Sequence, residues 1–231
     1  MTSHGRGRRL LALAAVVAAA ATALLLMLGA TGHEPAPVAP HHDAAATARP
    51  AVPAAEVALR QDMRALWEEH VVWTRLAIVD FAAGSPGLPA TEARLLRNQT
   101  DIGRAVGRVY GAAAGRRLTA LLREHIVIAV DVLIAAKAGD AAAVAAAQRR
   151  WVANANRIAG FLAAANPAWP RGEMRAMMGR HLGFTTTEAV AQLTGDYAGS
   201  ARAFDRVEAQ ARDMADMLSA GIVDQFPARF R

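Results

Sequence analysis

The sequence predicts an all-α protein, and three observations support this fold class. Hydrophobic residues make up 54% of the 231 residues but aromatic residues only 5%, and the excess is largely alanine, the strongest helix former. From residue 54 onward, apolar residues recur at intervals of three and four, which is the spacing of one helical face. Glycine and proline separate these periodic segments, as they do at helix ends. We therefore expect an antiparallel helical bundle.

The glycine and proline positions divide this region into four long helices and two shorter ones. The long helices are predicted over residues 54–82, 112–138, 140–165 and 196–225. Shorter helices over residues 91–109 and 171–194 fill the first and third connections as helical hairpin insertions. Lys137, Gly139 and Asp140 supply a terminal cation, a C-terminal glycine and an N-cap, so the second and third long helices should form a tight antiparallel hairpin.

An internal duplication is predicted at an offset of about 84 residues. The offset superimposes Trp67 on Trp151 without a gap, and two of only four tryptophans therefore match. Glycine and proline positions match at the same offset. Each half would contribute two long helices to a four-helix bundle with a shared pseudo-twofold axis.

The first 53 residues have the composition of an export segment and a tether. Three arginines precede an apolar run over residues 10–30, which is typical of a signal peptide. The run is also long enough to span a bilayer of about 30 Å, so residues 1–30 are either a signal peptide or an N-terminal membrane anchor. Residues 31–53 are rich in proline and alanine and predict a disordered linker. Residues 54–231 would then be a helical domain that is secreted, or held outside the cytoplasmic membrane by the anchor.

Composition excludes several classes of function. The chain has no cysteine, so disulfides, thiolate metal sites and cysteine nucleophiles are excluded. The formal charge is +6, but half of this excess comes from the three arginines before the apolar run. The remaining arginines are scattered and are not interleaved with aromatic residues, which argues against a nucleic-acid partner.

Polar residues interrupt the inward-facing stripes of the long helices. His70 and His125 each stand alone in an apolar stripe, and Asn154 occupies the position of His70 in the second half. Buried polar groups are retained only when they satisfy one another or bind a ligand. The sequence thus predicts a central pocket for a small ligand or a metal, built from a wider set of side chains: His70, Trp73, Thr74, Glu124, His125, Asn154 and Asp213. A divalent metal would be held by His70, His125 and Glu124.

Two alternatives to this binding protein remain open. The polar layer can be a satisfied core network in a scaffold protein that meets cell-envelope partners, or His125 can be the general base of an enzyme. No Glu-x-x-His pair, His-Glu-x-x-His, Gly-x-Ser-x-Gly or phosphate-loop motif supports a particular reaction. A further cluster of three methionines and a histidine at helical spacing suits either Cu(I) or core packing: Met174, Met177, Met178 and His181.

Several motifs between residues 63 and 227 are shared with a known group of proteins. They are Trp67-x-x-His70, Trp73-Thr74-Arg75, Glu124-His125, Trp151-x-x-Asn154, Asn166-Pro167-x-Trp169, His181-Leu182 and Gln225-Phe226-Pro227. In these motifs the chain resembles an uncharacterised bacterial two-repeat helical family, some of whose members are labelled acetylglutamate kinase. The resemblance implies the helical fold and the placement of these motifs, but it implies no reaction. A kinase activity finds no support, because the sequence lacks alternating strands and helices and a phosphate loop.

Overall fold

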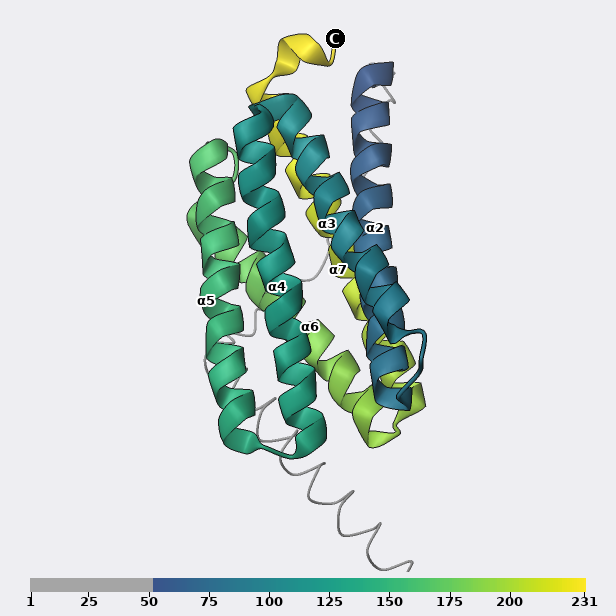
Figure 1. Cartoon of the computed structure of the whole chain (residues 1–231). Helices are drawn as coiled ribbons and strands as arrows, with labels where there is room; N and C mark the ends of the chain where they lie inside the picture. Colours follow the sequence, from purple (N-terminus) through teal and green to yellow (C-terminus); the bar gives the residue numbers. More distant parts are fainter. Residues whose placement is uncertain (1–51) are drawn as a thin grey trace, which may run out of the picture.

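The computed structural model describes residues 52–231, and this part of the chain is built from helices (Figure 1). The all-α prediction is confirmed, and no strand occurs between residues 52 and 231. Six helices are followed by a short 3-10 turn, η1 (Pro227–Arg229). The helices are α2 (Ala54–Ala83), α3 (Leu88–Tyr110), α4 (Ala112–Ala138), α5 (Ala141–Ala165), α6 (Arg171–Thr194) and α7 (Tyr197–Gln225).

The six helices are of comparable length. The two segments expected as short insertions, α3 and α6, have 23 and 24 residues, against 25 to 30 for the other four. They carry a full share of the core, including Ile102 on α3 and Leu182 on α6. The predicted four-helix bundle with two insertions is therefore not confirmed.

The helices close into a ring. Each helix packs against the next one along the chain, and α7 returns to pack against α2. Connections of only a few residues make neighbouring helices antiparallel, so α2, α4 and α6 run in one direction and α3, α5 and α7 in the other. The offset of 84 residues pairs α2 with α5, which run in opposite directions. The duplication at that offset is not confirmed.

Left-handed glycines end α2, α4 and α6. Gly84, Gly139 and Gly195 have φ values of 66°, 72° and 83°, a conformation that only glycine adopts without strain. Asp140 and Asp196 then cap α5 and α7 by accepting hydrogen bonds from backbone N–H groups. The hairpin predicted from Lys137, Gly139 and Asp140 is thus confirmed, and α2–α3, α4–α5 and α6–α7 form three successive hairpins.

Helices α3 and α4 approach each other at backbone distance. A Cβ atom added to Gly115 would lie 2.5 Å from the carbonyl oxygen of Gly103 and 2.9 Å from Cα of Gly107. Only residues without side chains allow this approach. The glycines of α3 and α4 therefore set the position of one hairpin against the next.

The predicted export segment cannot be compared with the structure. Residues 1–51, over which the signal peptide or anchor and nearly all of the linker are predicted, lie outside the described residues. Among the helices between residues 52 and 231, none is both long and apolar enough to cross a membrane.

Candidate functional site

Three buried histidines form a layer in the middle of the bundle. His70 on α2, His125 on α4 and His181 on α6 are 3%, 3% and 4% exposed. The ring of His181 lies 5.7 Å from that of His70 and 6.2 Å from that of His125, measured between centroids. Each histidine stands at the same distance in sequence before the left-handed glycine that ends its helix. The three helices that run in one direction thus present equivalent side chains to the centre.

Each histidine is hydrogen-bonded to an amide on the second helix of its own hairpin. The partners are Gln99, Asn154 and Gln210, at 3.1, 2.9 and 3.2 Å from the respective Nδ1 atoms. In all three pairs the amide follows the histidine by 29 residues. We refer to these six residues as the histidine layer.

The bonding of Asn154 assigns the protonation of His125. The Asn154 amide Nδ2 donates to the carbonyl of Leu121 at 3.1 Å, so its oxygen faces His125 and accepts the Nδ1–H proton. The other ring nitrogen, Nε2, is then unprotonated; it is buried and has no partner.

Burial keeps the histidine layer neutral. Loss of solvation lowers the pKa of His125 to about 3 and that of His181 to about 4, and it holds the pKa of His70 well below the usual value. The neighbouring imidazoles lower the pKa values of His70 and His125 further, while the bond to Asn154 opposes the shift at His125.

Of the predicted site residues, His70, His125 and Asn154 belong to the histidine layer. His70 and His125 meet through His181, which makes a ring contact with both. His181 was not among the residues predicted for the central pocket, and Gln99 and Gln210 were not singled out at all. A comparison of the chain with itself at an offset of about 55 residues would have found them. It aligns Met63-Arg64-Ala65, Leu118-Thr119-Ala120 and Met174-Arg175-Ala176, each seven residues before a histidine.

Two predicted carboxylates lie away from the histidine layer. Glu124 is partly exposed and forms an ion pair with Arg157 on the surface, because it is one residue, and so a large rotation, away from His125 on α4. Asp213 is exposed on α7, whose buried face runs through Gln210 and Met214. Neither prediction of a carboxylate in the central pocket is supported.

The other two predicted residues also lie outside the histidine layer. Trp73 is partly buried and stacks under the guanidinium of Arg94, which lies 5.1 Å from the ring centroid. Thr74 is one turn beyond His70 and donates a 2.7 Å hydrogen bond to its carbonyl oxygen. Thr74 instead lines the cavity described below.

The described residues do not assemble a metal site. Between residues 52 and 231, no group of three or more histidine, aspartate or glutamate side chains is arranged to hold a metal ion. The set of His70, His125 and Glu124 is therefore not brought together. Met174, Met177 and Met178 are buried in the main core, which confirms the packing interpretation of the methionine cluster.

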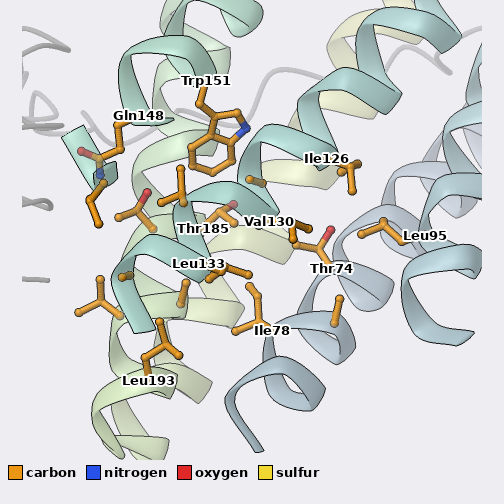
Figure 2. Close-up of a pocket in the computed structure, with 18 residues that line it drawn as sticks. Thr74, Ile78, Leu95, Ile126, Val130, Leu133, Gln148, Trp151, Thr185 and Leu193 are labelled. Atoms are coloured by element: carbon orange, nitrogen blue, oxygen red, sulfur yellow. The ribbon is translucent and has the colours of Figure 1, made fainter. Parts of the chain in front are cut away.

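A cavity of about 70 Å³ lies beyond the histidine layer, toward the end of the bundle where the left-handed glycines stand. Figure 2 shows its walls, which come from α2, α3, α4, α5 and α6. Aliphatic side chains predominate, and none of the lining residues is charged. Trp151 lines the cavity and also contacts His125, with the ring centroids 5.3 Å apart. Its indole thus joins the cavity to the histidine layer.

Three polar atoms in the cavity wall have no partner. Thr185 Oγ1, Thr186 Oγ1 and Trp151 Nε1 are buried and form no hydrogen bond with the described residues. On the same helix, by contrast, Thr187 and Thr194 each donate to the carbonyl four residues earlier, the usual bond of a helical threonine. Buried polar groups without partners are rare and costly, and these three atoms are also covered from the cavity, whose accessible surface is almost entirely apolar.

A buried ion pair lies on another face of α6. Glu188 is 1% exposed, and its Oε1 atom lies 2.8 Å from Nη1 of Arg75. Burial raises the pKa of Glu188 to about 7, although the bond to Arg75 opposes this shift. Arg75 also lies near Ser200 on α7, so this pair links α2, α6 and α7.

We predict that Asn154→Ala destabilises the protein by about 2 kcal/mol, because it leaves the His125 Nδ1–H buried without a partner. Asn156→Ala on the exposed face of the same helix is the control and should change the free energy of unfolding by less than about 0.5 kcal/mol. Urea denaturation followed by circular dichroism measures both. A loss of stability in Asn154→Ala as small as that in Asn156→Ala would show that the bond between His125 and Asn154 does not stabilise the protein.

Comparison with protein-family models, curated proteins and solved structures finds no match to this chain. The resemblance to the bacterial two-repeat helical family therefore stays a prediction.

Proposed function

We propose that this chain is an exported binding protein whose cavity beyond the histidine layer holds a small, largely apolar molecule. One observation carries the proposal: five helices enclose a cavity of about 70 Å³ whose lining is mainly aliphatic and contains no charged residue. Ligand sites have this composition, with mostly apolar walls and a few polar groups.

The proposed site is the cavity next to the histidine layer, and not the centre of the bundle. The side chains of the histidine layer are not free to bind a ligand, because they are hydrogen-bonded to one another. His70 is bonded to Gln99, and His125 is bonded to Asn154. A metal occupant is not favoured, because no carboxylate between residues 52 and 231 joins the histidines in a metal site and their Nδ1 atoms are already bonded. We expect the ligand to be an organic molecule.

The burial of the histidines favours binding over catalysis. A general base needs to reach the proton that it removes. His125 lies against Trp151, and His70 lies against Trp67 with the ring centroids 5.7 Å apart. Both are almost fully buried, so a substrate would have to displace a tryptophan to reach either one.

We also propose that the framework consists of three copies of a helical hairpin rather than two halves. The equal spacing of the three histidine–amide pairs and the three left-handed glycines support this arrangement. One turn beyond the histidines, the equivalent positions hold Thr74, Ala129 and Thr185. Thr74 is bonded and alanine has no polar group, so Thr185 alone of the three keeps an unpartnered hydroxyl.

We expect toluene and phenol to raise the melting temperature of the full chain, because both are small and mainly apolar, like the cavity wall. At ten times its dissociation constant, a ligand stabilises the folded state by about 1.4 kcal/mol. Ala189→Leu, which fills the cavity, should abolish the shift. Ala176→Leu, on the exposed face of α6, is the matched control and should preserve it. No shift of the unsubstituted chain with either compound would overturn the proposed function and favour a scaffold.

A further inference from the structure

We propose that a hollow between α3 and α4 binds a phosphate group through three arginine side chains. The hollow has a volume of about 600 Å³, and its wall includes Arg104, Arg108 and Arg116. It shares no lining residue with the apolar cavity. This second site is therefore independent of the proposed function.

Glycines keep the hollow open. Gly103, Gly107 and Gly115 line it at the place where the backbones of α3 and α4 touch. Because these residues have no side chains, the space between the larger side chains on either side is not filled. The hydroxyl of Thr119 lies against Gly103, where a side chain would otherwise stand.

The three arginines come from both helices. Arg104 and Arg108 are one turn apart on α3, and Arg116 lies on α4. All three are exposed, and no residue that lines the hollow is acidic. The antiparallel packing of α3 against α4 thus gathers cations that are separated in the sequence.

The positive charge at the hollow is only partly compensated. Arg104 forms an ion pair with Asp101, with 3.1 Å between nitrogen and oxygen. Arg108 and Arg116 form no ion pair with any residue between 52 and 231. Like charges one turn apart on a helix repel each other, so an anion between the arginines would relieve an unfavourable interaction.

The donors around the hollow favour a phosphate among anions. A guanidinium presents parallel N–H groups that match two oxygens of a phosphate. Thr100 and Thr119 also line the hollow, and their hydroxyls form no hydrogen bond with the described residues. Each hydroxyl can donate to a further oxygen. A phosphate has enough oxygens for donors on both helices, whereas a carboxylate has only two.

The hollow lies at the end of the bundle where α2 begins. Helix α3 runs antiparallel to α2, so its last turns and the first turns of α4 lie at that end (Figure 1). The predicted linker joins α2 at the same end, so an anchor over residues 1–30 would be tethered to the end that carries the hollow. Two sources therefore offer the phosphate, an anionic lipid headgroup and a free phosphate ion.

Amide NMR of the full chain during titration with inorganic phosphate tests the proposal. Phosphate replaces chloride at pH 7 and constant ionic strength, because surface electrostatics depend on salt. We expect saturable chemical-shift changes at the amides of Gly103, Gly107 and Thr119, with an apparent dissociation constant in the millimolar range.

Substitution of the arginines assigns the binding to the hollow. Arg108→Gln and Arg116→Gln should each weaken phosphate binding by about threefold, as expected for one exposed charged contact. Arg202→Gln is the matched control and should have no effect, because Arg202 is exposed on α7 at the opposite end of the bundle. Circular dichroism confirms that each variant is folded.

A second titration identifies the source of the phosphate. A water-soluble, short-chain phosphatidylglycerol replaces inorganic phosphate in the same measurement. Tighter binding of the lipid than of inorganic phosphate supports a lipid headgroup as the ligand, and tighter binding of inorganic phosphate supports the free ion.

Two results would overturn the proposal. One is the absence of saturable changes at the hollow with either compound. The other is an equal loss of binding in Arg202→Gln and in the two hollow variants, which would show that phosphate responds only to the net charge of the protein. Neither result bears on the apolar cavity, so the proposed function is tested separately.

Discussion

Gly115→Ala is expected to destabilise the protein by about 3 kcal/mol, at the upper end of overpacking effects. The added Cβ would stand 2.5 Å from the Gly103 carbonyl oxygen and 2.9 Å from Gly107 Cα. Both are backbone atoms, which cannot rotate away. Relief requires α3 and α4 to separate, and the separation would disturb the packing between the first two hairpins.

Gly160→Ala on α5 is the matched control, since nothing lies within 4 Å of the added Cβ at that position. Alanine is a stronger helix former, so this variant should be more stable by about 0.5–1 kcal/mol. Urea denaturation of both variants measures the two effects. Stabilisation by both substitutions would contradict the backbone contact between α3 and α4.

The second large effect that we expect is a loss of folding stability on acidification. The folded-state pKa values of the three histidines lie below the ordinary value of 6.5, so the unfolded chain binds protons that the folded chain does not. The stabilisation is fully present above pH 6.5 and is lost as the pH falls from 6.5 toward 4. Each histidine contributes a slope of about 1.4 kcal/mol per pH unit in this window.

Glu188 acts in the opposite direction. Its pKa is raised to about 7 from 4.5, so the folded state binds a proton more readily, and stability from this group increases as the pH falls from 7 to 4.5. The net loss on acidification should therefore correspond to about two histidines over that range. Glu188→Gln removes the opposing contribution and should steepen the loss.

Denaturant titrations at intervals between pH 7 and pH 4 measure how the free energy of unfolding depends on pH, for the unsubstituted chain and for Glu188→Gln. A free energy of unfolding that does not change between pH 6.5 and pH 5 would contradict the burial of the histidine layer. An identical slope in Glu188→Gln would contradict the raised pKa of Glu188.

The helix boundaries could be predicted from the sequence because the signals that end a helix are local. Gly84, Gly139 and Gly195 end three helices through their own backbone conformation, and Asp140 caps the next helix through its own side chain. Such signals depend on a few consecutive residues. The predicted boundaries therefore lie close to the observed ones.

The arrangement of the helices could not be predicted in the same way. The offset of 84 residues rested on Trp67 and Trp151, and both tryptophans do contact histidines. Trp67 contacts His70 on its own helix, whereas Trp151 contacts His125 across the α4–α5 hairpin. Their match thus does not reflect equivalent positions in the fold.

The candidate site was found only in part, for two physical reasons. Glu124 neighbours His125 in sequence, but neighbouring residues of a helix face different directions, so proximity along the chain did not bring its carboxylate inside. The cavity is lined mainly by common aliphatic residues from five helices. Which of them line one cavity depends on how the helices pack, and the sequence does not give that packing. Only Thr185 and Thr186 distinguish the cavity, and they do so by lacking a bond that other threonines on α6 form.

Methyl NMR of the full chain during titration with phenol tests the binding cavity most directly. We predict chemical-shift changes at Thr185, Thr186, Val130 and Leu133, together with the indole N–H of Trp151, and none at Thr119 in the distant α3–α4 contact. Changes confined to residues outside the cavity, or no changes at phenol concentrations that saturate a millimolar site, would contradict the account.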